Sequence, residues 1–434
     1  MKKFDRKNLI YVSLMIFSMF FGAGNLIFPP LLGQLSGTKM PLSLAGFLIS
    51  AVGLPILAIV VVAKSGGLHI LASRVHPRFA LAFTILIYLS IGPFLGIPRA
   101  ASLAFEMGVS PFLSNQISDS SLPLFIYTLV YFAIAYWLCM TPSKLVDRFG
   151  KFLTPVLLIL ITTIFIFSFV KPIGAFTAPI GEYASSPVLK GFLDGYMTMD
   201  AIAALNFGIV ISIALNDMGV TEEKQLISRT IKAGAIAGMI LAIIYGMLAY
   251  LGAVSQTRFG AVENGAQTLT NVVFYLFGQN GLILLGIIFS LACLTTSVGL
   301  ITSCSQYFAK LMPKVSYKAW ITIFSLSSMM FANVGLSRIL KFSVPALTAI
   351  YPMAIVLMII ALFDKCFKGN RYVYLFAMIF TSVVSILDAL GQFGLKINAL
   401  NILPFYSNGL GWVVPAIVGI IIGFVYGKLK NKTV

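Results

Sequence analysis

Residues 21–30 read Phe21-Gly22-Ala23-Gly24-Asn25-Leu26-Ile27-Phe28-Pro29-Pro30 and lie inside the first long apolar segment of the chain, 8–34. A helix of about 20 apolar residues crosses the hydrocarbon core of a bilayer, and this segment is long enough. Glycine loosens a helix and proline removes a backbone donor, so the stretch predicts a helix that is interrupted at membrane depth. Because lipid cannot satisfy the freed N–H and C=O groups, such a break must be buried in protein or line a wet cavity.

The composition is typical of a membrane protein. The chain has 434 residues, of which 59% are hydrophobic and only 10% are charged, and its mean hydropathy is +0.98. A water-soluble domain carries about a quarter charged residues. The apolar runs are continuous rather than alternating, which excludes a β-barrel. The sequence therefore predicts an all-α polytopic membrane protein that forms one transmembrane domain.

About twelve apolar runs are long enough to span the bilayer as helices. The predicted spans are 8–34, 41–63, 79–105, 122–141, 152–171, 194–215, 231–253, 280–308, 317–333, 341–363, 372–392 and 411–427. Two predicted outer loops are longer than the others, 172–193 and 255–279, and the second contains an amphipathic stretch over 266–277. A short interfacial helix is predicted in a cytoplasmic loop, over 68–74.

The net charge of +17 is distributed unevenly between the loops. Assigning the loops alternately to the two sides, with the N-terminus inside, places most Lys and Arg residues on the cytoplasmic side. The outer side keeps Lys39, Arg99, Lys171, Lys190, Arg258, Arg338, Lys341 and Lys396. This positive-inside pattern predicts an even number of spans, with both termini in the cytoplasm. The first apolar run ends in Pro-Pro rather than in a small-residue cleavage site, so it is predicted to be a span and not a signal peptide.

A second predicted span, 194–215, is also unusual for a membrane helix. Its first part, from Asp194 to Gly208, contains acidic residues, an asparagine and glycines. It opens the second half of the chain, as the broken segment opens the first half. Interrupted segments at matching places in two halves indicate the binding site of a transporter. We therefore expect two inverted five-helix repeats, 8–171 and 194–363, and two additional helices within 372–427.

Asp200 is the most informative single residue of this second segment. An ionisable side chain inside the membrane costs roughly 2.5–3.5 kcal/mol on insertion scales and usually has a function. Asp200 could bind a substrate ammonium group, take part in ion coupling or carry a proton; the alternative is a structural carboxyl group. For Asp194 and Asp388, structural roles are at least as plausible.

The break at Gly22-Ala23-Gly24-Asn25 offers backbone groups to two kinds of ligand. Its free N–H groups, at the positive end of the following half-helix, suit a carboxylate. Its free carbonyls suit a small cation, and Asn25 could serve either ligand. The alternative is a close helix crossing, for which small residues are also typical. Together with Asp200, the break favours a small zwitterionic solute.

The predicted eighth span contains adjacent hydroxyl residues, Thr295 and Thr296. Such hydroxyls often only bond the preceding helical turn. Beside a broken first helix, their oxygens could instead join freed carbonyls around a sodium ion, which prefers oxygen ligands.

The sequence lacks the residues that an enzyme of a common class would need. His69 and His76 are the only histidines, and no HExxH, GxSxG or Walker A motif is present. Cys139, Cys293, Cys304 and Cys366 show no metal or disulfide spacing and are expected to be packing residues. The aromatic residues that flank the breaks could shape a pocket, although core packing is the simpler role for each: Tyr11, Phe20, Phe21 and Phe207.

Three motifs make the chain similar to a known family. They are Phe20 to Pro30, Ile91-Gly92-Pro93 with Ile97-Pro98-Arg99, and Asp194-Gly195-Tyr196-Met197-Thr198-Met199-Asp200-Ala201. With these motifs the chain resembles, over essentially its whole length, the bacterial branched-chain amino acid:cation symporters. These carriers, also called branched-chain amino acid transport system II, belong to the amino acid-polyamine-cation superfamily.

The resemblance implies uptake of leucine, isoleucine and valine driven by sodium or, in some members, by protons. It also implies the sodium-symporter (LeuT-like) fold of five plus five inverted repeats, with helices 1 and 6 discontinuous. Alignment onto that fold places sodium between carbonyls near Ser18 and Phe21 and the residues Ala292, Thr295 and Thr296. The backbone of the substrate would lie against Gly22, Ala23, Gly24 and Asn25, and against Met197, Thr198, Asp200 and Ala201.

The leading hypothesis is therefore secondary active symport of branched-chain amino acids by a monomer, with no cofactor besides the coupling ion. A channel or facilitator would give flux without ion coupling, and paired broken helices speak against a simple pore. A membrane-embedded enzyme would need a catalytic constellation that the sequence lacks. Proton-coupled uptake and a non-transporting amino acid sensor remain alternatives.

Overall fold

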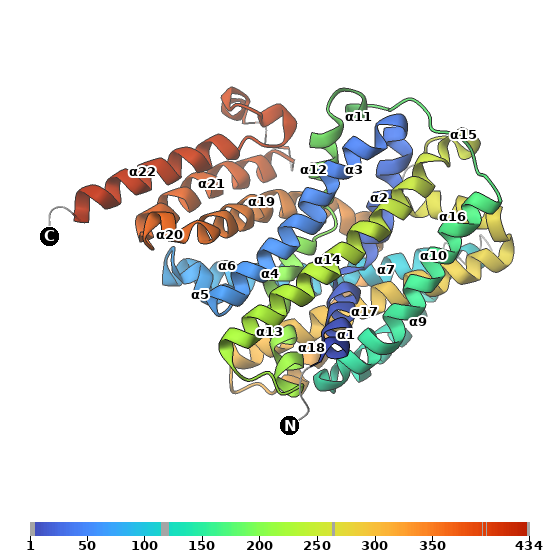
Figure 1. Cartoon of the computed structure of the whole chain (residues 1–434), viewed down its shortest axis with the longest axis horizontal. Helices are drawn as coiled ribbons and strands as arrows, with labels where there is room; N and C mark the ends of the chain where they lie inside the picture. Colours follow the sequence, from blue (N-terminus) through green and yellow to red (C-terminus); the bar gives the residue numbers. More distant parts are fainter. Residues whose placement is uncertain (1–4, 114–120, 263–264, 393, 396, 432–434) are drawn as a thin grey trace.

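The computed structural model describes residues 5–113, 121–262, 265–392, 394–395 and 397–431. Within these ranges every regular element is a helix (Figure 1). The α-helices are α1 Arg6–Phe20, α2 Ala23–Ser36, α3 Met40–Leu48, α4 Leu54–Ser65, α5 Leu68–Ser73, α6 Pro77–Leu89, α7 Gly96–Gly108, α9 Leu122–Cys139, α10 Thr154–Val170, α11 Glu182–Ser185, α12 Pro187–Tyr196, α13 Asp200–Asp217, α14 Glu223–Ala253, α15 Gln256–Phe259, α16 Gly265–Phe277, α17 Gln279–Leu311, α18 Tyr317–Ala332, α19 Leu336–Leu362, α20 Asp364–Phe367, α21 Arg371–Gln392 and α22 Val413–Asn431.

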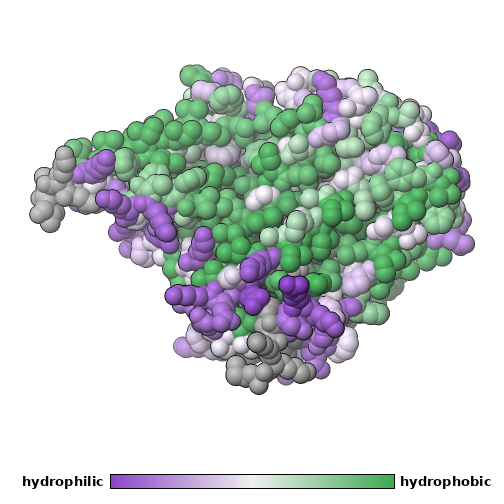
Figure 2. Space-filling model, in the orientation of Figure 1, coloured by the Kyte–Doolittle hydropathy of each residue, from purple (hydrophilic) through white to green (hydrophobic). Residues whose placement is uncertain are grey.

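The protein is a multi-pass membrane protein. The described residues contain ten helical segments that are long and apolar enough to cross a membrane. Figure 2 shows a broad hydrophobic band across the visible face, with hydrophilic residues gathered below it near the N-terminus. The predicted spans fall on described helices, and the number of crossings, the repeats and the side of each loop stay predictions. Residues 1–4 and Lys396, which entered the charge assignment, lie outside the described ranges.

The first membrane helix is interrupted where its sequence predicts. Helix α1 ends at Phe20, and α2 begins at Ala23. Phe21 leaves the helical conformation, with φ −73° and ψ 87°, and Gly22 is extended, with φ −125° and ψ −152°. Pro29 and Pro30 lie within α2 and do not end it, so the break comes from the glycine segment.

The second broken helix consists of α12 and α13, which are joined through Met197 to Met199. Met199 has φ 69° and ψ 6°, a left-handed conformation that costs a non-glycine residue about 1–2 kcal/mol. The predicted start of this span at Asp194 is wrong: α12 already begins at Pro187, inside the predicted loop 172–193. Proline is a favoured first residue of a helix because its missing N–H is not needed there.

The predicted continuous helix 79–105 is also interrupted. A π-helical turn, Ser90–Phe94, separates α6 from α7, and Gly92 within it has non-helical angles. Pro93 removes one backbone donor at this point. A Cβ atom on Gly92 would lie only 2.8 Å from the Cys304 sulfur of α17, so glycine permits close packing there. A second π-helical turn, Ile49–Gly53, joins α3 to α4.

Close backbone contacts hold α2 against α14. A Cβ atom on Gly33 would lie 1.8 Å from the Ala249 carbonyl oxygen, and one on Gly252 would lie 1.9 Å from the Pro30 oxygen. Small residues permit such approaches between membrane helices. The half-helix α2 is thereby fixed, and its N-terminus is held at the break.

Three peripheral features complete the architecture. The predicted interfacial helix corresponds to α5, and the predicted amphipathic stretch corresponds to α16. At the left of Figure 1, α21 and α22 lie side by side, and α21 packs against α19.

Candidate functional site

The two helix breaks meet around a small buried cavity of about 20 Å³. A space of that size admits about one water molecule. Of the residues predicted to bind substrate, six line it: Gly22, Ala23, Gly24, Asn25, Thr198 and Asp200. Thr296, predicted as an ion ligand, lines it too. Met197 takes part through its backbone, described below, whereas Ala201 is fully buried and does not line the cavity.

A hydrogen-bonded network connects the two breaks. The Asn25 side-chain nitrogen donates to Asp200 Oδ2 at 2.5 Å and also to the Tyr245 hydroxyl oxygen. The Tyr245 hydroxyl donates to the same Asp200 oxygen at 2.9 Å. All three side chains are at most 2% exposed. Tyr245 lies on α14, and the sequence analysis did not identify it.

The first turn of α2 keeps backbone donors at the break. Asn25 Oδ1 accepts a hydrogen bond of 3.1 Å from the Gly22 amide, so this amide does not continue the hydrogen-bond ladder of α1. The N–H groups at the start of a helix have no partners within that helix. They lie at the positive end of the helix dipole, where an anion is stabilised. This geometry suits a carboxylate group.

The position of Arg99 shows that its predicted assignment to the outer side is wrong. The sequence analysis placed it on the outer side, but its side chain is only 4% exposed and lines the cavity. Its Nη1 donates to the Met197 carbonyl at 2.9 Å, and its Nη2 donates to the Thr198 carbonyl at 3.4 Å. Those carbonyls belong to the non-helical link between α12 and α13. A charged residue inside the predicted span 79–105 was the signal that could have revealed it.

The predicted ion ligands form a second cluster on the other side of Gly22. Thr295 Oγ1 lies 2.9 Å from the Ser18 carbonyl oxygen and 3.0 Å from the Ala292 carbonyl oxygen, and its single hydroxyl hydrogen can be donated to either. Thr296 Oγ1 lies 3.3 Å from the same Ser18 oxygen. Phe21 is fully buried at the end of α1, and a Cβ on its neighbour Gly22 would lie 2.7 Å from Thr296 Oγ1. The cluster therefore brings carbonyl and hydroxyl oxygens from α1 and α17 together.

The remaining candidate residues have simpler surroundings. Phe20 lines the cavity and packs against Phe207, with 5.4 Å between the ring centroids. Asp194 forms an ion pair with Lys190 at 3.0 Å and accepts a hydrogen bond from Tyr183. Asp388 accepts a hydrogen bond of 3.1 Å from Tyr406. These contacts agree with structural roles for both aspartates.

The cysteines are free: Cys139, Cys293 and Cys304 are buried, and Cys366 is exposed. Within the described ranges, no three His, Cys, Asp or Glu residues are grouped as metal ligands would be.

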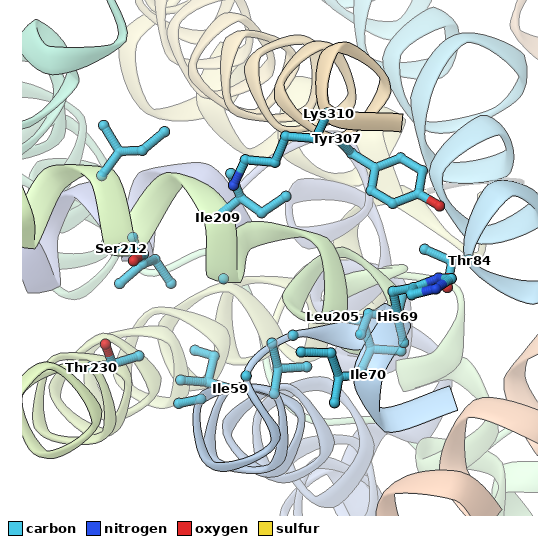
Figure 3. A pocket seen from close by; sticks show the side chains of 18 of the residues that line it. Ile59, His69, Ile70, Thr84, Leu205, Ile209, Ser212, Thr230, Tyr307 and Lys310 are labelled. Atoms are coloured by element: carbon cyan, nitrogen blue, oxygen red, sulfur yellow. The ribbon is translucent and has the colours of Figure 1, made fainter. Parts of the chain in front are cut away.

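A larger cavity of about 540 Å³ lies near the cavity at the breaks, and we call it the vestibule (Figure 3). Figure 3 shows Tyr307 and Lys310 of α17 on one side of it, with Ile70 across from them. The two cavities share helices: on α13, Ala203 lines the small cavity and Leu205 lines the vestibule. These two residues are two positions apart, so both cavities reach the same stretch of α13.

Two tyrosines in the wall of the vestibule stack on each other. Tyr88 and Tyr307 stack with 4.2 Å between ring centroids and 4° between ring planes, and both line the vestibule. One turn further along from Tyr88, Ile91 lines the small cavity. The Tyr88 hydroxyl lies 3.5 Å from the Asn206 carbonyl, which also accepts a hydrogen bond of 2.6 Å from Ser303.

Two solved structures share this fold. A nucleobase-cation-symport-1 family transporter, MHP1, in a closed conformation with bromovinylhydantoin bound, matches 98% of this chain and 93% of its own, with a TM-score of 0.60 and 14% identity. MhsT in complex with L-phenylalanine matches 97% of this chain and 98% of its own, with a TM-score of 0.54 and 18% identity. At these identities the likeness concerns the fold alone.

Sequence relatives are much closer. The branched-chain amino acid permease BrnQ of Bacillus subtilis (strain 168) is 46% identical over 439 residues, which cover 100% of this chain and 99% of the permease. The branched-chain amino acid transport system 2 carrier protein of Pseudomonas aeruginosa is 41% identical, over 100% of this chain and 98% of the carrier. The family model described as branched-chain amino acid transport protein matches residues 5–430. The chain therefore belongs to the branched-chain amino acid transport protein family.

Proposed function

We propose that this protein takes up leucine, isoleucine and valine across the bacterial cytoplasmic membrane together with sodium, by alternating access. The substrate class is supported by the relatives, which are named branched-chain amino acid permeases and carriers. The coupling ion is argued from the arrangement of oxygen atoms at the first break.

The position of the Ser18 carbonyl is the observation that supports sodium as the coupling ion. In an unbroken helix it would accept a hydrogen bond from the Gly22 amide. The Gly22 amide instead bonds Asn25 Oδ1, so the Ser18 oxygen is released and faces the hydroxyls of Thr295 and Thr296. Rotation of those hydroxyls turns oxygen lone pairs toward a cation, and the carbonyls of Phe21 and Ala292 complete the proposed oxygen set. Sodium is a hard cation for which such oxygens are suitable ligands.

The small cavity supplies the chemistry for an amino acid. Amides of Ala23, Gly24 and Asn25 at the start of α2, next to Gly22, bind the carboxylate, and Asp200 attracts the ammonium group. Thr198, Met199 and Asp200 of the second break form the facing wall. Apolar side chains also line the cavity and suit a branched aliphatic group: Met19, Phe20, Ile91, Ala203 and Leu300.

Transport requires the small cavity to open, because about 20 Å³ cannot hold a leucine. The vestibule provides the path on one side. The Tyr88–Tyr307 pair lies in its wall, and Ile91, three residues after Tyr88, lines the small cavity. The vestibule lies beside α5, at the end of α17 that carries Lys310 and Leu311. With the predicted orientation, this is the cytoplasmic side, and substrate would leave through it.

The proposed architecture follows from the same placement of the two breaks. Two inverted repeats each open on a discontinuous helix: the first covers 8–171, and the second, with its start corrected to Pro187, extends to residue 363. Residues 372–427 add two helices. Both termini are in the cytoplasm, and the monomer is the transporting unit, since one chain supplies all the proposed ligands.

Uptake by purified protein in proteoliposomes tests the proposal. Labelled leucine should accumulate inside only when sodium is high outside, and the accumulation should collapse in potassium buffer. Uptake that is driven by a pH gradient and is unaffected by sodium would indicate that protons, not sodium, are the coupling ion. Equilibration without accumulation would indicate a facilitator, and binding without uptake would indicate a sensor.

A further inference from the structure

Arg99 is a buried permanent cation in the wall of the small cavity, and the proposed transport mechanism gives it no role. It lies in the first turn of α7, directly after the interrupted Ser90–Phe94 segment, and its side chain is 4% exposed. Burying a charge away from water is costly unless it is paired and hydrogen-bonded. A guanidinium group at this depth therefore indicates a function, as Asp200 does.

The hydrogen bonds of Arg99 leave one of its three guanidinium nitrogen atoms without a partner among the described residues. Nη1 and Nη2 bond the Met197 and Thr198 carbonyls, which fixes the plane of the guanidinium group. Nε is buried and has no hydrogen-bond partner among the described residues. A buried donor without a partner costs about 1–3 kcal/mol, which a bound acceptor would offset.

The guanidinium group also lies beside the predicted carboxylate-binding amides. A Cβ atom placed on Gly24 would be 2.8 Å from Arg99 Nη2, and any side chain larger than hydrogen would collide with it. Glycine at this position thus keeps the start of α2 and the cation in contact. Arg99 and Asp200 line the same cavity, so it presents one positive and one negative side chain to a zwitterion.

We propose that Arg99 binds the α-carboxylate of the substrate, together with the amides at the start of α2. This inference rests on the proposed amino acid transport. Arginine suits the role because its rigid fork of donors matches a carboxylate. On binding, the carboxylate accepts from the free Nε–H, while the contacts with the Met197 and Thr198 carbonyls of the α12–α13 link hold the guanidinium group in place.

The test compares leucine with leucinol, which has a hydroxymethyl group in place of the carboxylate. Binding of each is measured on purified protein in sodium buffer. Wild type should bind leucine at least about 30-fold more tightly, since loss of one partner of a buried charge pair has effects of that size or larger. In Arg99→Gln this preference should shrink to a few-fold, mainly because the affinity for leucine falls. Arg99→Lys, which keeps the charge and loses the fork, should lie between the two.

If Arg99 had a purely structural role, its replacement would lower the affinities for leucine and leucinol by the same factor. An unchanged leucine-to-leucinol affinity ratio in Arg99→Gln would therefore overturn the proposal. Arg258→Gln is the matched control, because Arg258 also bonds a backbone carbonyl, that of Ile173 at 2.9 Å, but lies outside the site. It should keep the wild-type ratio.

If Arg99→Gln does not fold, Arg99→Lys carries the same comparison, and an unchanged leucine-to-leucinol ratio in that variant would overturn the proposal. Wild type gives a further test. Equal affinity for leucine and leucinol would show that no residue recognises the carboxylate, and the proposal would fall. The proposed function fails separately, if wild type neither binds nor transports leucine.

Discussion

The Asn25 side chain donates a hydrogen bond of 2.5 Å to Asp200 Oδ2 and thereby connects the α1–α2 break to the α12–α13 break. Tyr245 donates to the same oxygen, so three helices meet at one carboxylate. A movement at either break therefore changes the surroundings of Asp200. This relationship explains how a ligand at the first break could alter the second.

Removing the charge of Asp200 should stop transport. Asp200→Asn keeps the shape of the side chain but loses the attraction for an ammonium group and turns acceptors into donors beside Asn25. We expect leucine uptake in proteoliposomes to fall at least about 30-fold, the usual result of losing one member of a buried charge pair. Asp388→Asn, whose carboxylate accepts from Tyr406 at the other end of the molecule, should transport normally. Wild-type uptake by Asp200→Asn would remove Asp200 from the site.

Loss of the hydroxyls on α17 should weaken sodium activation. Thr295→Val and Thr296→Val each remove one oxygen near the Ser18 carbonyl, and the sodium concentration for half-maximal uptake should rise about tenfold, equivalent to 1.4 kcal/mol. Leucine affinity at saturating sodium should change little. The matched control is Thr322→Val, an exposed threonine on α18 that bonds only the preceding turn at 3.0 Å. Normal sodium activation in both α17 variants would contradict the proposed ion site.

A methyl group on Gly24 should close the site. Its Cβ would lie 2.8 Å from Arg99 Nη2 and 2.9 Å from the Thr198 Cα, where backbone must shift to make room. Gly24→Ala should therefore abolish leucine binding while the protein remains folded, as size-exclusion and thermal-stability measurements can check. Gly246→Ala on α14 is the comparison, since its Cβ would meet only one atom, at 3.9 Å. Binding retained by Gly24→Ala would show that substrate does not approach this backbone.

The vestibule should be accessible from the cytoplasmic side and should close during transport. With Cys366→Ser as background, because Cys366 is the exposed cysteine, Ser212→Cys should react with a membrane-impermeant thiol reagent applied from that side. Sodium and leucine together should slow the reaction if they favour a state closed to the cytoplasm. Asn280→Cys, at the opposite end of α17, should react only from outside. Labelling of Ser212→Cys only from outside would reverse the proposed orientation.

Much of the site was predictable because its residues violate the ordinary rules for membrane helices. Glycines and an asparagine in an apolar run predicted the break at residues 22–25, and a carboxylate at membrane depth predicted Asp200. The residues indicated that Thr295 and Thr296 could join freed carbonyls of the first broken helix. Ser18 as their partner followed only from the resemblance, since no local pattern states which residues of two helices meet.

The unpredicted parts depend on tertiary contacts or on weak local signals. Arg99 was assigned to the outer side because counting charges by loops ignores charges within spans. Tyr245 is an ordinary tyrosine until the fold brings it to Asp200. The left-handed Met199 has no sequence signal, because a non-glycine residue adopts that conformation only when its surroundings impose it.

The most direct test of the central claim is the flux of radioactive sodium that leucine induces in proteoliposomes. The account predicts that leucine stimulates sodium uptake, that the two fluxes keep a fixed ratio as leucine is varied, and that Thr296→Val lowers both. Accumulation of leucine without any leucine-dependent sodium flux would contradict it.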